Sequence, residues 1–128
     1  MVRFAATRRA GFTLMELAIV LAILGVLLRV ATPGFQRTIL RSRETVLKQD
    51  LAGLREAIDG FFADHRRYPD TLEVLVEKRY VRKLPVDPFT RRADTWVTVA
   101  PEEGEGGVWD VRSGSDLVGL DGTAYNEW

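Results

Sequence analysis

The most prominent pattern in the chain is an apolar run near its amino terminus. The 17 residues from Phe12 to Leu28 include only Thr13 and Glu16 as polar side chains, and Arg29 closes the run. A helix of this length lies at the lower limit of what crosses the hydrocarbon core of a bilayer. The pattern therefore predicts a membrane-spanning helix with a carboxylate near its start.

A second pattern follows Pro33 and has the period of an amphipathic helix. Its apolar positions are separated by steps of 4, 3, 4 and 3 residues: Leu47, Leu51, Leu54, Ile58 and Phe61. We expect one continuous helix from about Phe12 to Phe62, whose apolar stripe is domain core or, as the alternative, a partner-binding face. Gly25 and Pro33 can open this helix locally, because proline removes a backbone hydrogen bond.

The remainder of the chain predicts a small α+β unit packed on the long helix. Asp70 and Glu73 have the spacing of a helix cap, which places a short helix between Leu72 and Lys78. Two strand-like runs, Thr95 to Ala100 and Val108 to Ser113, flank an acidic, glycine-rich stretch and predict an antiparallel hairpin. The fold class is therefore α+β.

Charge and composition narrow the choice of function. The chain has 18 basic and 18 acidic residues, so no overall field selects nucleic acid, and it has no cysteine. The leader has arginines and no acid, which predicts a cytoplasmic amino terminus: Arg3, Arg8 and Arg9. His65 is the single histidine, and among charged residues at a helix end it favours a solvated or capping role over catalysis. We expect a protein that is not an enzyme.

Glu16 is the wrong residue for a lipid environment unless a cation compensates it. A charge in mid-membrane costs roughly 2.5 to 3.5 kcal/mol, and less near the interface. Arg29 is too far along the same helix, because 13 residues of helix span about 20 Å. Cleavage between Gly11 and Phe12 would create an α-amino group four residues before Glu16, within reach on the same or a neighbouring helix.

The run from Arg8 to Glu16, Arg-Arg-Ala-Gly-Phe-Thr-Leu-Met-Glu, resembles the processing site of the type IV pilin and type II secretion pseudopilin superfamily. The resemblance implies that a prepilin peptidase cuts after Gly11 and methylates the new amino terminus, Phe12. It also implies that Glu16 pairs with the amino terminus of an adjacent subunit during filament assembly. The alternatives are an ordinary signal anchor with a chance glutamate and a cleavable secretory signal, for which the residues after the apolar run offer a poor cleavage site.

Motifs further along the chain are similar to the major pseudopilins of type II secretion systems. They are Arg67-Tyr68-Pro69, Tyr80-Val81, Leu84-Pro85 and Asp87-Pro88-Phe89, followed by the hairpin and a terminal tryptophan. By themselves these residues fill and turn a small core. The resemblance implies a pilin-like fold in four parts: a cleaved basic leader (1–11), a transmembrane and assembly helix (12–32), its amphipathic continuation (33–63) and a periplasmic globular domain (64–128).

The same resemblance implies a function and a set of partners. The function is that of a structural subunit of a periplasmic pseudopilus, anchored in the bacterial inner membrane before it polymerises. Its expected partners are further copies of itself, the prepilin peptidase, the inner-membrane assembly platform and minor pseudopilins, and not nucleic acid. A type IV pilin of a surface filament and a membrane-tethered binding module are the alternatives.

The stretch from Ser113 to Thr123 is rich in glycine and short oxygen side chains, which suit either turns or a calcium site. The resemblance implies a calcium ion in this loop, and Asp116 falls on the family's Gly-x-Asp position. Thr123 and Ala124 stand where the family has adjacent acids, which leaves Asp121 as the substitute. The predicted ligands are Asp116, Asp121 and Ser113, and we expect the ion to stabilise the domain.

Overall fold

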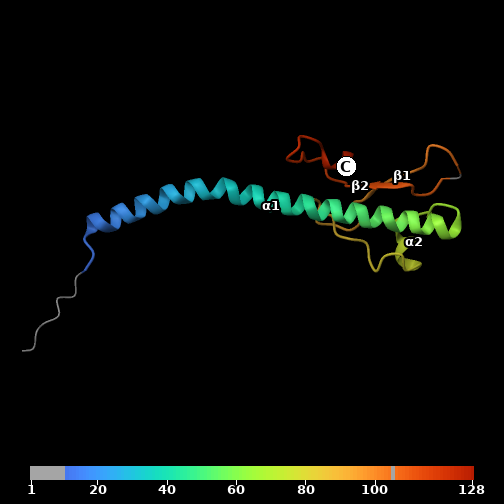
Figure 1. Cartoon of the computed structure of the whole chain (residues 1–128), viewed down its shortest axis with the longest axis horizontal. Helices are drawn as coiled ribbons and strands as arrows, with labels where there is room; N and C mark the ends of the chain where they lie inside the picture. Colours follow the sequence, from blue (N-terminus) through green and yellow to red (C-terminus); the bar gives the residue numbers. More distant parts are fainter. Residues whose placement is uncertain (1–10, 105) are drawn as a thin grey trace, which may run out of the picture. The chain divides into compact units, whose positions relative to one another are not determined.

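The computed structural model describes residues 11–104 and 106–128, which fall into two compact units divided between Arg37 and Thr38. Its elements are α1 (Leu14–His65), α2 (Leu72–Glu77), β1 (Val97–Val99), β2 (Asp110–Arg112) and the 3-10 helix η1 (Tyr125–Glu127) (Figure 1). The predicted long helix and the α+β class are confirmed. The leader arginines Arg3, Arg8 and Arg9 lie outside the described residues.

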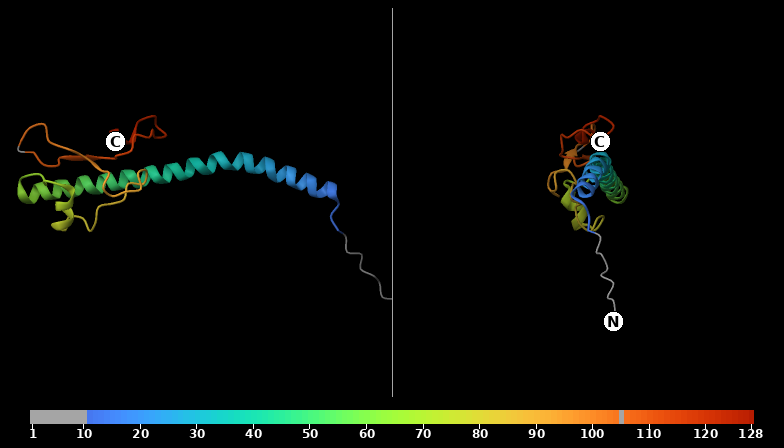
Figure 2. Two further views of the ribbon diagram at one scale, coloured as in Figure 1. Left: turned by 180° about the vertical axis from the view of Figure 1, so that it is seen from behind. Right: turned by 90° about the vertical axis from the view of Figure 1, so that its left-hand side faces the viewer.

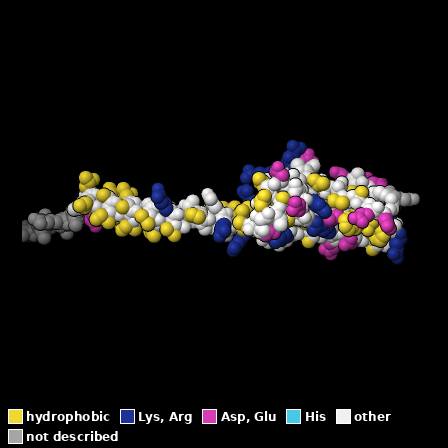
Figure 3. All heavy atoms as spheres, turned by 90° about the horizontal axis from the view of Figure 1, so that it is seen from above, with side chains coloured by type: hydrophobic (Ala, Val, Ile, Leu, Met, Phe, Trp, Pro, Cys, Tyr) yellow, Lys and Arg dark blue, Asp and Glu magenta, His cyan; other side chains and the backbone are white. Residues whose placement is uncertain are grey.

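The described part of the first unit, residues 11–37, consists of the beginning of α1 and the short segment before it. The helix is long and apolar enough to cross a membrane, with a mean hydropathy of 2.4 over 18 residues, none of which is buried. Hydrophobic side chains cover this part of the helix in the view of Figure 3. A helix that is apolar on all its faces requires lipid or other helices around it.

The helix α1 continues without a break through both Gly25 and Pro33. The Thr32 hydroxyl donates to the carbonyl of Leu28 at 2.6 Å, one turn back along the helix. This side-chain bond lies next to Pro33, whose ring nitrogen cannot donate to the carbonyl of Arg29. The single subunit is thus helical here, while local opening in an assembled filament stays a prediction.

The second unit, Thr38–Trp128, has its core along the apolar stripe of α1. The five stripe residues are each at most 2% exposed: Leu47, Leu51, Leu54, Ile58 and Phe61. They pack in one cluster with residues of α2, the hairpin and η1, namely Leu72, Leu75, Trp96, Val108, Val111 and Tyr125. The stripe is therefore domain core, as predicted, and each large side chain contributes about 1.5 to 3 kcal/mol on burial.

The elements after α1 lie on different sides of its carboxy-terminal half. Helix α2 lies on one side, and the hairpin and the carboxy-terminal segment lie on another (Figures 1 and 2). Strands β1 and β2 are antiparallel, with Val97 opposite Arg112 and Val99 opposite Asp110. The hairpin is confirmed, but each strand has three residues and is shorter than predicted.

Trp96 and Ser113 flank the ladder at one end, and their side chains bond outside the hairpin. The indole N–H of Trp96 donates to the Pro85 carbonyl at 2.8 Å, and the Ser113 hydroxyl donates to Asp87 at 2.5 Å. Both side chains are buried. These two contacts fasten one end of the hairpin to the turn that contains Pro85 and Asp87.

The predicted cap of the short helix is wrong by one residue. The cap of α2 is Thr71, and its side chain makes no capping hydrogen bond. Asp70 instead lies 3.6 Å from Arg67 in an exposed ion pair. Adjacent aspartate and threonine are both favourable cap residues, so spacing alone could not choose between them.

Candidate functional site

The predicted cleavage site lies in non-helical backbone just before α1. Gly11 is exposed, with open space where a Cβ would be, and Phe12 is 81% exposed. Exposed segments with small residues, outside helices and strands, are the positions that proteases cut most readily. The bond between Gly11 and Phe12 is thus open to a peptidase.

Thr13 and Glu16 begin the helix together. The backbone N–H of Glu16 donates to Thr13 Oγ1 at 3.1 Å, and that of Leu17 donates to the Thr13 carbonyl at 3.1 Å. Thr13 is therefore the cap, and Glu16 is the third residue of the helix. Its negative charge lies near the positive end of the helix dipole, which favours it there. We did not predict this cap, although Thr-x-x-Glu is its usual signature.

The structure places Glu16 on an otherwise apolar, exposed surface. Its described neighbours along α1 are exposed too, with Leu14 at 86%, Met15 at 72% and Leu17 at 51%. Among the described residues, Glu16 takes part in none of the ion pairs. The carboxylate is thus available to a cation supplied from outside the chain.

The three predicted calcium ligands do not share one environment. Ser113 is completely buried and directs its hydroxyl to Asp87, whereas Asp116 and Asp121 are exposed. Asp121 Oδ1 accepts hydrogen bonds from the backbone N–H and the hydroxyl of Thr123, at 2.9 and 2.7 Å, which lower the pKa of its carboxyl. The described residues hold no group of three or more acids and histidines suited to a metal. These three side chains do not fit calcium as a set.

Asp87 is the buried acid of the Leu-Pro-x-Asp-Pro turn. It accepts hydrogen bonds from the backbone N–H groups of Phe89 and Thr90, at 2.8 and 3.3 Å, and from Ser113. A buried carboxylate needs several donors of this kind. The residue fastens the turn to the end of β2, a structural role.

Two charged residues of α1 that we did not single out from the sequence hold the carboxy-terminal segment. Arg55 donates to Asp110 at 2.7 Å and to the carbonyls of Val111 and Trp128 at 3.0 and 2.9 Å. Glu44 is buried and accepts hydrogen bonds from the backbone of Leu120 and the hydroxyl of Tyr125. Contacts across this sequence separation leave no local signal in the sequence.

His65 has the capping role expected for it. Its Nδ1 lies 3.1 Å from the Phe61 carbonyl in the last turn of α1, and its ring stacks on that of Phe61 at 4.1 Å between centroids. Nearby, Tyr80 donates to Asp64, and this hydrogen bond raises the pKa of the Tyr80 hydroxyl. The histidine thus closes a helix end beside an aromatic pair.

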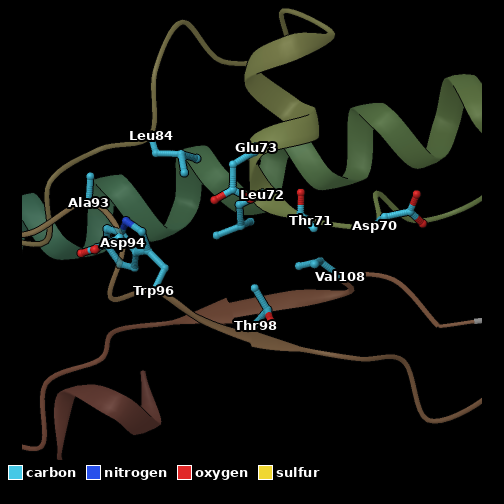
Figure 4. Close-up of a pocket in the computed structure, with 10 residues that line it drawn as sticks. All are labelled: Asp70, Thr71, Leu72, Glu73, Leu84, Ala93, Asp94, Trp96, Thr98 and Val108. Carbon is cyan, nitrogen blue, oxygen red and sulfur yellow. The ribbon is translucent and has the colours of Figure 1, made fainter.

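A pocket of about 240 Å³ lies between the start of α2 and the hairpin (Figure 4). Leu72, Trp96 and Val108 contribute apolar surface to it. Of its acids, Asp94 bonds Arg92 at 2.6 Å. The pocket's lining thus combines core side chains with polar residues such as Thr71, Asp94 and Thr98.

Comparisons with known proteins agree with this geometry. Residues 6–28 match the family model of the prokaryotic N-terminal methylation motif. The chain is 32% identical to the type II secretion system core protein G of Pseudomonas aeruginosa, over 90% of this chain and 86% of the relative. With the core protein G of Escherichia coli K12 it shares 30% identity, over 85% of this chain and 83% of the relative. No solved structure matches the chain significantly.

A methylation motif, a long apolar helix and a small α+β domain define the class: the chain is a type IV pilin-like subunit. The matches that extend over most of both chains go further. The chain belongs to the family of type II secretion system core protein G, the pseudopilins.

Proposed function

We propose that this chain is the major pseudopilin of a type II secretion system, cut after Gly11, methylated on Phe12 and polymerised into a periplasmic pseudopilus. The observation that carries the proposal is the exposed apolar first part of α1, with a carboxylate in its first turn, directly after an exposed Gly11-Phe12 bond. The function needs no catalysis by the subunit itself.

Cleavage supplies the positively charged partner that Glu16 lacks. The new α-amino group belongs to Phe12, and assembly brings it to the Glu16 carboxylate of a neighbouring copy. Each group is costly alone in an apolar environment, and pairing reduces both costs in one contact. The apolar faces of stacked helices then exclude lipid and water together, which favours a continuous filament core.

The anchor helix supports a location in the inner membrane. The arginines of the leader favour a cytoplasmic amino terminus, so the second unit would lie in the periplasm. In this arrangement the peptidase meets the Gly11-Phe12 bond on the cytoplasmic side. The inner-membrane assembly platform and minor pseudopilins are the partners that start and extend the filament.

A surface type IV pilin is the second candidate. The chain is 43% identical to the type IV major pilin protein PilA of Myxococcus xanthus, but over 49% of this chain and only 29% of that pilin. The match to core protein G extends over most of both chains, which favours the pseudopilus.

Deletion of the gene in its host tests the proposal. We expect secreted enzymes to accumulate in the periplasm and the wild-type gene to restore their export. Filaments should be confined to the periplasm at native expression. Long surface filaments with unchanged secretion would identify a surface pilin instead.

A further inference from the structure

Glu44, a buried carboxylate of the second unit, has no part in the proposed cleavage and assembly. Glu44 lies on α1 and is only 8% exposed. Its Oε1 accepts hydrogen bonds from the backbone N–H of Leu120 at 2.8 Å and from the hydroxyl of Tyr125 at 2.9 Å. Among the described residues, it takes part in none of the ion pairs. Two donors from the carboxy-terminal segment therefore compensate its burial.

The loop before η1 folds so that these donors face α1. Val118 forms an antiparallel bridge with Ala124, and Gly119 N–H donates to the Thr123 carbonyl at 2.8 Å. Gly119 lies against the carboxylate, because a Cβ there would come within 3.0 Å of Glu44 Oε1. The absence of a side chain at Gly119 lets the loop approach the helix this closely.

Aromatic packing fixes the second donor. The ring of Tyr125 stacks on Phe89 at 3.8 Å and meets the edge of Trp128 at 5.0 Å between centroids. Lys48, one turn after Glu44 on α1, holds its ammonium 4.8 Å from the Trp128 ring. The Tyr125 hydroxyl is thus positioned at the carboxylate by packing and not by the hydrogen bond alone.

The polarity of this contact is opposite to that of a calcium site. Calcium binds six to eight converging oxygens, and here a backbone N–H and a hydroxyl converge on an anion. Of the predicted ligands, Ser113 bonds Asp87, and Asp121 already accepts two hydrogen bonds from Thr123. The residues of this loop are arranged to receive a carboxylate.

The geometry points to Glu44 as the group that closes the carboxy-terminal loop, in the role that a bound cation would otherwise have. The carboxylate is part of the helix, so the loop is fastened without a metal ion. The stability of the second unit then depends on Glu44 and is independent of calcium.

Thermal unfolding of the mature full-length chain in detergent micelles tests this inference. Tryptophan fluorescence reports on the second unit, because Trp96, Trp109 and Trp128 all lie in it. We expect the wild-type midpoint to be the same in calcium chloride and in excess chelator. A bound calcium would raise it, because a ligand that binds only the folded state stabilises that state.

Variants of Glu44 supply the second readout. Glu44→Ala removes the acceptor of both donors and should lower the midpoint by at least about 5 °C for a unit of this size. Glu44→Gln keeps an acceptor without the charge, and its midpoint should lie between those of the wild type and Glu44→Ala. Glu56→Ala, at an exposed glutamate of the same helix, is the matched control and should leave the midpoint unchanged.

Hydrogen exchange at Leu120 separates loop opening from general destabilisation. In Glu44→Gln the Leu120 amide should exchange about tenfold faster, while amides of the α1 core lose only the protection that the lower global stability accounts for. A wild-type midpoint that rises with calcium, or a Leu120 amide unchanged in Glu44→Gln, would overturn the inference.

Discussion

Replacement of Glu16 separates assembly from folding. Glu16→Ala removes a carboxylate that takes part in none of the ion pairs among the described residues, whereas the hydrogen bond to Thr13 comes from the Glu16 backbone. The Thr13 cap uses that backbone N–H and is kept in the variant. We therefore expect the helix and the second unit to fold as in the wild type.

The cost appears when subunits join. Without Glu16, the amino terminus of an incoming copy is left unpaired among apolar side chains, at a cost of about 2.5 to 3.5 kcal/mol. At 1.4 kcal/mol for each tenfold change, a loss of about 3 kcal/mol weakens each addition roughly 100-fold. Because every subunit of the filament repeats this contact, the variant should not form filaments at native expression.

The assay compares Glu16→Ala and Glu16→Gln with Glu56→Gln, an exposed carboxylate of the same helix. Electron microscopy of isolated filaments measures assembly, intact mass measures cleavage, and tryptophan fluorescence measures folding. We expect both Glu16 variants to be cleaved and folded but unassembled, and Glu56→Gln to assemble normally. Normal filaments from Glu16→Ala would refute the charge-pairing mechanism.

Three further predictions concern the second unit. Arg55→Lys keeps the charge but loses the forked contact with Asp110 and the two carbonyls. Because the Arg55 side chain is 39% exposed, we expect the free energy of unfolding in urea to fall by only about 1 to 2 kcal/mol. An unchanged urea midpoint would contradict this. Ser113→Ala removes a donor from the buried Asp87 and should cost about 1 to 3 kcal/mol; full stability in the same assay would show that the contact is dispensable. Burial and the Glu44 carboxylate raise the pKa of the Tyr125 hydroxyl from 10.0 to about 12. The protonated hydroxyl therefore stabilises the fold fully below pH 10, and this contribution is lost as the pH rises through about 12. Ultraviolet titration should show its tyrosinate at about pH 12, and titration at its ordinary value would contradict the buried contact.

The parts of the fold that depend on local patterns could be predicted from the sequence. The apolar run and the 4-3-4-3 stripe gave α1 and its buried face, because helix periodicity is visible in consecutive residues. The hairpin was predicted from two strand-like runs, but not the early ends of its strands. The contacts of the flanking Trp96 and Ser113 with Pro85 and Asp87 are likewise not visible in the strand pattern.

The carboxy-terminal contacts could not be predicted in the same way. Glu44 and Arg55 fit the polar positions of an amphipathic helix, where charged residues are usually solvated. Their partners lie 55 to 81 positions further along the chain, as for Asp110 and Tyr125. The Thr13 cap, in contrast, had a local signature in the spacing of Thr13 and Glu16.

We propose that proteolysis creates the positive charge that Glu16 requires. The most direct measurement is the intact mass of the protein isolated from its native membrane. We predict the mass of residues Phe12 to Trp128 plus one methyl group. A functional protein that retains its first eleven residues would contradict the account.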